Sequence, residues 1–200
     1  MGKNSIVFFT IAVLSFCVSG EVWAVVDIFT DNISEQGRYS YVYPQEGSSI
    51  GLTGEEKHSG ANSLKISLNT DDFAGAAVGK YPPFNLQYNR DNAVLEFWVK
   101  GKTGGEIFEV LFLDADRTDG TKTETGVVAV PKYVSVTTDW QNVKIPLSDF
   151  SDNGQYWDGS KNMPDSVDWS EIQEIKFAIR PYDENTAFTI YVDDIKIMNQ

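Results

Sequence analysis

Apolar and polar residues alternate along much of the chain. The clearest case is the segment 93–101, in which Leu95, Phe97 and Val99 are separated by one glutamate and one tryptophan. Because successive side chains of a strand point to opposite faces, this period predicts a strand with one buried face. Four more segments show the same period, at residues 66–68, 143–147, 175–179 and 188–192. Repeated alternation of this kind is typical of antiparallel sheets.

Turn-forming residues separate the predicted strands. Clusters rich in Gly, Ser, Asn and Asp occur at residues 47–49, 58–60, 101–105, 118–120 and 152–154. The pattern predicts about ten strands, spaced as in a β-sandwich or jelly roll. One short helix is predicted at residues 168–171, where Asp168 and Glu171 have the spacing of a capping box. Since no repeat or linker interrupts the pattern, we expect one all-β domain, an antiparallel β-sandwich, over residues 25–200.

The first 24 residues have the features of a secretory signal peptide. Lys3 supplies a positive start, residues 6–16 are apolar, and Val22 and Ala24 are small residues at the positions that precede a cleavage site. The apolar stretch of about 11 residues is too short to span a bilayer, so we expect no membrane insertion. The sequence therefore predicts a secreted protein, extracellular or periplasmic, cleaved after Ala24. The single cysteine, Cys17, would be lost with the signal.

The composition restricts the classes of partner and of chemistry. The chain has 16 basic and 29 acidic residues and a formal net charge of −13. This excess of negative charge argues against nucleic acids and anionic membranes as partners. With one histidine, His58, and no cysteine after the signal, a Cys/His dyad and a cysteine-rich zinc site are excluded. Carboxylate chemistry and metals bound by oxygen remain open.

Three stretches together resemble a known family of modules. They read KHSGANSLKI at residues 57–66, WQNVKIPLSDF at 140–150 and FTIYVDDIKI at 188–197. Their order and spacing resemble the galactose-binding-like jelly rolls of non-catalytic carbohydrate-binding modules, with families 4, 11 and 22 as the nearest. The resemblance covers essentially the whole chain after the signal. It implies a secreted module that binds a polysaccharide, of β-glucan type. A polysaccharide-degrading enzyme that works with it would be a separate chain, or the module serves capture rather than digestion. Two of the motifs are also similar to assembly-factor domains related to respiratory complex I, against which secretion argues.

The same resemblance implies a structural calcium ion that ties the start of the chain to the last strand and to an early loop. Calcium takes six to eight oxygen ligands, mixing carboxylates with backbone carbonyls. Asp31 or Asn32 could replace the N-terminal ligand, and Asp193 could instead begin a bulge or cap a turn. A second acidic run, at residues 114–120, is similar to the start of an EF-hand loop but is expected to be a polar hairpin loop. The implied calcium ligands are Asp27, His58, Gly60, Ser63 and Asp193.

Aromatic side chains are the candidates for sugar binding, because pyranose faces stack on aromatic rings. The chain has 5 Trp, 9 Tyr and 12 Phe. If Leu95, Phe97 and Val99 face the core, Trp98 points outward. The same reasoning turns Arg180 outward at the end of its strand. If both strands belong to one sheet, these side chains and the nearby Tyr182 line one groove.

Two further aromatic groups are open to either a functional or a structural interpretation. Tyr39, Tyr41 and Tyr43 form an alternating stripe, which is either a second platform or part of the core. Tyr156 and Trp157 lie in a predicted long loop, residues 152–165, as a lid or as ligand contacts. The predicted ligand-binding residues are Trp98, Arg180, Tyr182, Tyr156, Trp157 and Tyr41.

The motifs of glycan-degrading enzymes are missing from the sequence. The E-x-D-x-x-E signature of jelly-roll glucanases, the Arg, Gln-x-His and Tyr motifs of jelly-roll alginate lyases and a G-x-S-x-G elbow do not occur. We therefore expect no catalytic activity. Two alternatives remain open: a structural or adhesive domain that binds a protein, and a hydrolase or lyase that uses a pair of carboxylates with separated pKa values.

Overall fold

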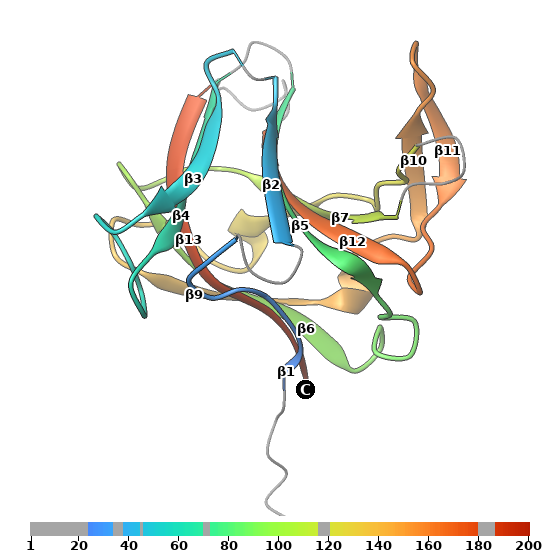
Figure 1. Ribbon diagram of the computed structural model, residues 1–200, viewed down its shortest axis with the longest axis horizontal. Helices are drawn as coiled ribbons and strands as arrows, with labels where there is room; N and C mark the ends of the chain where they lie inside the picture. The colour runs from blue at the N-terminus through green and yellow to red at the C-terminus, as the bar shows by residue number, and fades with distance from the viewer. Residues whose placement is uncertain (1–23, 34–37, 45, 70–72, 116–120, 180–186) are drawn as a thin grey trace, which may run out of the picture.

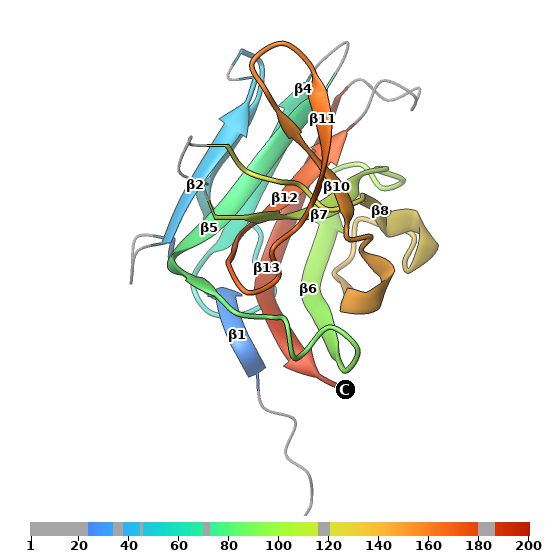
Figure 2. The same ribbon diagram turned by 90° about the vertical axis from the view of Figure 1, so that its right-hand side faces the viewer.

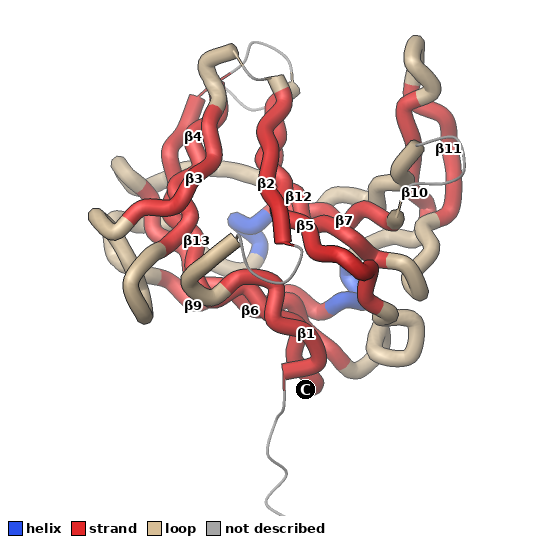
Figure 3. The backbone as a smooth tube through the Cα atoms, in the orientation of Figure 1, coloured by secondary structure: helices blue, strands red, loops and turns tan. Residues whose placement is uncertain are grey.

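Two antiparallel sheets face each other in the computed structural model, which describes residues 24–33, 38–44, 46–69, 73–115, 121–179 and 187–200 (Figure 1). Strands make up most of the described chain, and its helical segments are two 3-10 turns, η1 (Val130–Lys132) and η2 (Leu147–Asp149) (Figure 3). No helix in this described part is long and apolar enough to cross a membrane. The expected all-β sandwich is therefore confirmed.

The first sheet contains six strands and holds the C-terminal strand at its centre. Its order is β3-β4-β13-β6-β9, and β1 also pairs with β13. Figure 2 shows β13 and β6 running side by side. The strands are β1 (Ala24–Phe29), β3 (Ser49–Thr53), β4 (Ser63–Asn69), β6 (Ala93–Gly101), β9 (Gln141–Pro146) and β13 (Ala187–Asn199).

The second sheet contains five strands in the order β2-β5-β12-β7-β8. A hairpin of two further strands, β10 and β11, stands beside its β7 side (Figure 1). These strands are β2 (Arg38–Tyr43), β5 (Ala74–Phe84), β7 (Glu109–Asp114), β8 (Val128–Ala129), β10 (Asn153–Trp157), β11 (Asn162–Ser166) and β12 (Ile172–Ile179).

The core between the sheets contains the residues that the alternation assigned to the buried face. Leu95, Phe97 and Val99 of β6 are fully buried, as are Ile175 and Phe177 of β12. The rings of Phe97 and Phe177 meet edge to face across the two sheets, with centroids 5.6 Å apart. Burial of such apolar area is the main stabilising contribution to a sandwich of this kind.

Two sequence-based predictions of local structure are wrong. Residues 168–171 form a turn, because Asp168 accepts the N–H of Ser170 at 2.9 Å and β12 begins immediately afterwards at Ile172. The predicted loop over residues 152–165 is largely the β10–β11 hairpin. Its turn is closed by Asp158, which accepts the N–H groups of Ser160 and Lys161, each at 2.8 Å.

Candidate functional site

The tyrosine stripe of β2 lies on the outer face of the second sheet. Val42 packs against the core, so Tyr39, Tyr41 and Tyr43 point the other way. The interpretation of this stripe as core is therefore wrong. Tyr81, at an outward position of β5, continues the stripe, and its ring centroid lies 5.2 Å from that of Tyr39. We call the outer surface formed by β2, β5 and β12 the tyrosine face.

Small residues on β5 form the floor of the tyrosine face. Gly79 stands between Tyr39 on β2 and Glu174 on β12 in the strand register. A Cβ added at Gly79 would lie 2.3 Å from Cζ of Tyr39, so this ring lies directly on the β5 backbone. Ala77 occupies the next outward position, opposite Tyr41. The sequence of β5 thus leaves room for tyrosine rings to lie along the sheet.

A buried carboxylate holds two of these tyrosines. The hydroxyl of Tyr39 donates to Oε1 of Glu174 at 2.5 Å, and that of Tyr41 donates to Oε2 at 2.7 Å. The carboxylate of Glu174 is fully buried and also pairs with the ammonium group of Lys122. Burial, followed by the hydrogen bond to Glu174, raises the pKa of Tyr39 far above that of an ordinary tyrosine. Glu174 is therefore satisfied by three donors from two other segments.

A second ion pair lies on the same face. The ammonium group of Lys176 pairs with Glu124, and its stem lies so close to Gly75 that an added Cβ would be 2.9 Å from Cδ. Its Nζ also lies 5.7 Å from the ring centroid of Phe73. Lys122 and Lys176, which lie on the described part of the tyrosine face, are thus neutralised by glutamates.

The β10–β11 hairpin continues the second sheet beyond β7. The backbone of Glu124 forms one isolated β-bridge with Leu113 of β7 and another with Gln155 of β10. Because directly paired residues point to the same face of a sheet, Gln155 points to the side of the tyrosine face. Trp157, two residues further along β10, points the same way and is exposed, whereas Tyr156 points to the opposite side. In Figure 1 the hairpin and β2 stand on opposite sides of the floor strands β5, β12 and β7.

The groove predicted around Trp98 does not form as expected. Trp98 lies on β6 in the first sheet, whereas β12, the strand before Arg180, belongs to the second sheet. Arg180 and Tyr182 themselves lie outside the described residues. Trp98 does point away from the core, as predicted, but the imidazole of His58 stacks on it with ring centroids 3.7 Å apart. A loop therefore covers this ring.

The loop over residues 57–62 is fastened by carboxylates that accept its N–H groups. The buried Asp193 accepts the N–H groups of His58 and Ser59, at 2.9 and 3.1 Å. Burial raises the pKa of Asp193. A register shift between Asp193 and Lys196 marks a bulge, which lets Asp194 also reach the loop, where its Oδ2 lies 2.9 Å from Nδ1 of His58.

These contacts show which of the carboxylates expected at the implied calcium site reach the loop, and the ion itself stays a prediction. Asp31, rather than Asp27, reaches the loop, where it accepts the N–H of Ala61 at 2.7 Å and lies against Gly60. Asp27 lies opposite Lys196 in the register of β1 and β13. The hydroxyl of Ser63 donates to the carbonyl of residue 56 at 2.5 Å. Within the described ranges no group of three or more His, Cys, Asp or Glu residues is placed to hold a metal.

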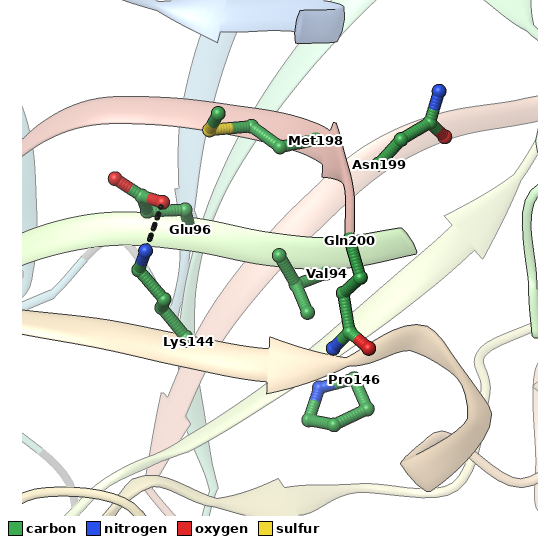
Figure 4. A pocket seen from close by; sticks show the side chains of 7 residues that line it. All are labelled: Val94, Glu96, Lys144, Pro146, Met198, Asn199 and Gln200. Carbon is green, nitrogen blue, oxygen red and sulfur yellow. Dashed lines mark ion pairs between the residues drawn. The ribbon is translucent and has the colours of Figure 1, made fainter. Parts of the chain in front are cut away.

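A shallow cavity of about 260 Å³ lies on the outer face of the first sheet (Figure 4). Its apolar side is formed by Val94, Pro146 and Met198, and the ion pair of Glu96 with Lys144, at 3.1 Å, lies at its edge. No aromatic ring lines this cavity. Since stacking on rings is the main apolar contact that proteins make with sugars, the tyrosine face is the better candidate site.

A two-sheet antiparallel sandwich with aromatic side chains on an outer face is the architecture of a carbohydrate-binding module. The profile of the family described as Carbohydrate binding domain 30 matches residues 25–199, and the chain belongs to this family. The expected kind of module is thereby confirmed, and the family is 30, whereas families 4, 11 and 22 were expected to be the nearest. No curated protein matches the chain significantly.

Solved structures of carbohydrate-binding modules resemble the chain over most of its length. The family 30 module of the cellulosomal cellulase Cel9D-Cel44B of Clostridium thermocellum is 26% identical, with a TM-score of 0.67, and the match covers 88% of this chain and 97% of the module. The family 11 module of the cellulosomal cellulase Lic26A-Cel5E of the same organism is 17% identical, with a TM-score of 0.61 and coverage of 90% and 95%. The second likeness concerns the fold alone.

Several residues of the tyrosine face were not among the sequence-based candidates. Glu174 is a polar residue at an outward position of an alternating strand, and this pattern could have indicated it as a residue of the outer face. Tyr81 follows the small residues of β5 by the same period of two. The positions of Lys122 and Gln155 at the tyrosine face could not be inferred from the sequence. Both positions depend on the path of the segment 121–126 between β7 and β10.

Proposed function

We propose that the protein binds a neutral β-glucan chain on the tyrosine face, between β2 and the β10–β11 hairpin, without cleaving it. The observation that carries the proposal is the set of exposed rings on one side of the second sheet and of the hairpin beside it. Their side chains expose large fractions of their surface although they stand on ordered strands. The exposed fractions are 38% for Tyr41, 66% for Tyr43, 53% for Tyr81 and 58% for Trp157.

The charges of the tyrosine face support a neutral ligand. Lys122 and Lys176 are paired with Glu174 and Glu124, so neither offers an uncompensated positive charge to a uronate. The net charge of −13 would in addition repel acidic polymers such as alginate and pectin. A neutral polymer meets no such repulsion.

Similarity to solved structures supports a β-glucan as the neutral polymer. The family 30 relative is a module of a cellulosomal cellulase. A structure of the family 11 module was determined with a mixed-linked β-1,3-1,4 tetrasaccharide. We extend this class of ligand to the present chain as part of the proposal.

Binding without cleavage is supported by the state of the glutamates on this face. A glycosidase needs a carboxylic acid and a carboxylate that both approach the glycosidic bond. Glu174 is buried beneath two tyrosines, and Glu124 is engaged by Lys176. Neither glutamate is placed to meet a sugar on the surface.

Secretion and a partner enzyme belong to the same proposal. The features of residues 1–24 support export, and a module without catalytic groups would depend on a separate enzyme to degrade the bound polymer. Calcium is left out of the proposal, because Asp193, one of the two carboxylates expected to bind it, accepts N–H groups of the loop over residues 57–62.

Affinity electrophoresis of residues 25–200 against a panel of polysaccharides tests the proposed function. We expect mixed-linkage β-glucan to retard the protein, with no loss of the polymer's viscosity, and we expect no retardation by alginate or pectin. Tyr43→Ala and Trp157→Ala should each reduce the retardation. Migration unaffected by every polymer would contradict the proposal and favour the protein-binding alternative.

A further inference from the structure

We propose that Glu174 is a positioning residue that holds the rings of Tyr39 and Tyr41 in the orientation needed for sugar binding. This inference rests on the proposed function of the tyrosine face. It concerns a residue that a sugar would not touch, since the carboxylate is fully buried.

The first step of the argument is the reach of the two tyrosines. Tyr39 lies on β2 and Glu174 on β12, with β5 between them. Adjacent strands are about 4.8 Å apart, so the two backbones are separated by about twice that distance. A phenol hydroxyl can reach the carboxylate only if its ring leans across the intervening strand. Gly79 permits this, because its missing side chain leaves the space that the Tyr39 ring fills.

The second step is the orientation that the carboxylate enforces. Each of its oxygens accepts one hydroxyl, Oε1 from Tyr39 and Oε2 from Tyr41. Hydrogen bonds to an ionised acceptor are stronger than those between neutral groups. Both rings are thus fixed at their backbone end by β2 and at their hydroxyl end by one side chain. A ring fixed at both ends loses little conformational entropy when a sugar stacks on it.

The third step is the cost of keeping this charge buried. A buried carboxylate requires desolvation, and replacing a buried ion pair by apolar groups is often neutral or stabilising. Stability alone therefore gives little reason for a glutamate and Lys122 at this place. Holding the rings of Tyr39 and Tyr41 in place would explain why a charged glutamate is buried here.

Isothermal titration calorimetry with a mixed-linkage tetrasaccharide tests the inference. Glu174→Gln retains the size of the side chain but removes the charge, and we expect binding about tenfold weaker. Tyr41→Phe retains the ring and removes only the tethered hydroxyl, and we expect binding about threefold weaker. Glu96→Gln is the matched control, since Glu96 is also buried and paired with lysines but lies on the first sheet. It should bind as the wild type does.

Tyrosine absorbance during an alkaline titration gives a readout that general loss of stability would not produce. In the wild type, Tyr39 should stay protonated well above the usual pKa of a tyrosine side chain. In Glu174→Gln, measured where circular dichroism shows a folded protein, the pKa of Tyr39 should be lower than in the wild type, because the hydrogen bond to the carboxylate and its charge are lost while the burial remains. Unchanged affinity and an unchanged titration in this variant would overturn the inference.

Tyr43→Ala separates the failure of this inference from that of the proposed function. Tyr43 is exposed and pairs with Gly75 in the strand register, away from Glu174. If Tyr43→Ala weakens binding and Glu174→Gln does not, the tyrosine face binds sugar and the positioning role is wrong. If the wild type binds no β-glucan, both the proposed function and this inference are overturned.

Discussion

His58 lies flat on Trp98, with ring centroids 3.7 Å apart and ring planes 13° apart. His58 belongs to the loop over residues 57–62, and Trp98 to the centre of β6. The edge of Trp140 completes the cluster, with its centroid 5.9 Å from that of His58. The stack therefore fastens the loop to the outer face of the first sheet, on the opposite side of the sandwich from the tyrosine face.

Trp98→Ala should lower stability and leave sugar binding unchanged. The substitution removes a half-buried ring and the surface on which His58 rests, which should cost about 2 kcal/mol of the free energy of unfolding. Urea unfolding measures this loss, and calorimetry with the tetrasaccharide measures affinity at a temperature where the variant is folded. Loss of binding at unchanged stability would show that Trp98 contacts the ligand.

The sequence predicted the direction of side chains better than the grouping of strands. Alternation correctly turned Leu95, Phe97 and Val99 inward and Trp98 outward. It could not tell that β6 and β12 belong to different sheets, because the period of a strand contains no information about its neighbours. The proposed groove around Trp98 failed for this reason.

Long-range pairing also explains what the sequence left open at the candidate site. Tyr39 and Glu174 are 135 residues apart, and they meet only because β5 lies between β2 and β12. The stripe of tyrosines was visible in the sequence, but its face depends on Val42 packing inward. The β10–β11 hairpin was hidden by Gly, Asn and Asp residues, which are typical of loops.

Chelation should leave the unfolding temperature unchanged. Asp31 and Asp193 accept N–H groups of the loop over residues 57–62, and we expect these hydrogen bonds to anchor it. Thermal unfolding followed by circular dichroism, with EDTA and then with added calcium, measures the effect. A marked fall with EDTA that calcium reverses would establish the structural calcium ion that the family resemblance implies.

Alkaline destabilisation should depend in part on Tyr133. Burial, followed by the hydrogen bond to Asp149, raises the pKa of Tyr133 to about 12, whereas an unfolded tyrosine titrates near 10. The folded protein thus holds this proton more tightly. The resulting stabilisation is complete below about pH 10 and is lost as the pH rises from about 10 to about 12.

Tyr133→Phe is the variant that tests this dependence. Its free energy of unfolding should fall less steeply than that of the wild type across the same pH range. Some dependence should remain, because the pKa of Tyr39 is raised as well. Urea unfolding at several pH values gives the two slopes, and equal slopes would show that Tyr133 does not contribute.

Gly79→Ala should weaken sugar binding although it alters a residue that lies beneath the surface rings. The new methyl group would lie 2.3 Å from Cζ of Tyr39 and 2.5 Å from its hydroxyl oxygen, so the ring must move away from Glu174. Overpacking of this kind typically costs about 1–3 kcal/mol of stability. Gly51→Ala on β3 is the control, since nothing lies within 4 Å of the added carbon there. Calorimetry measures the sugar affinity of both variants, and urea unfolding measures their stability. Equal affinity and stability in the two would mean that the Tyr39 ring does not depend on the space above Gly79.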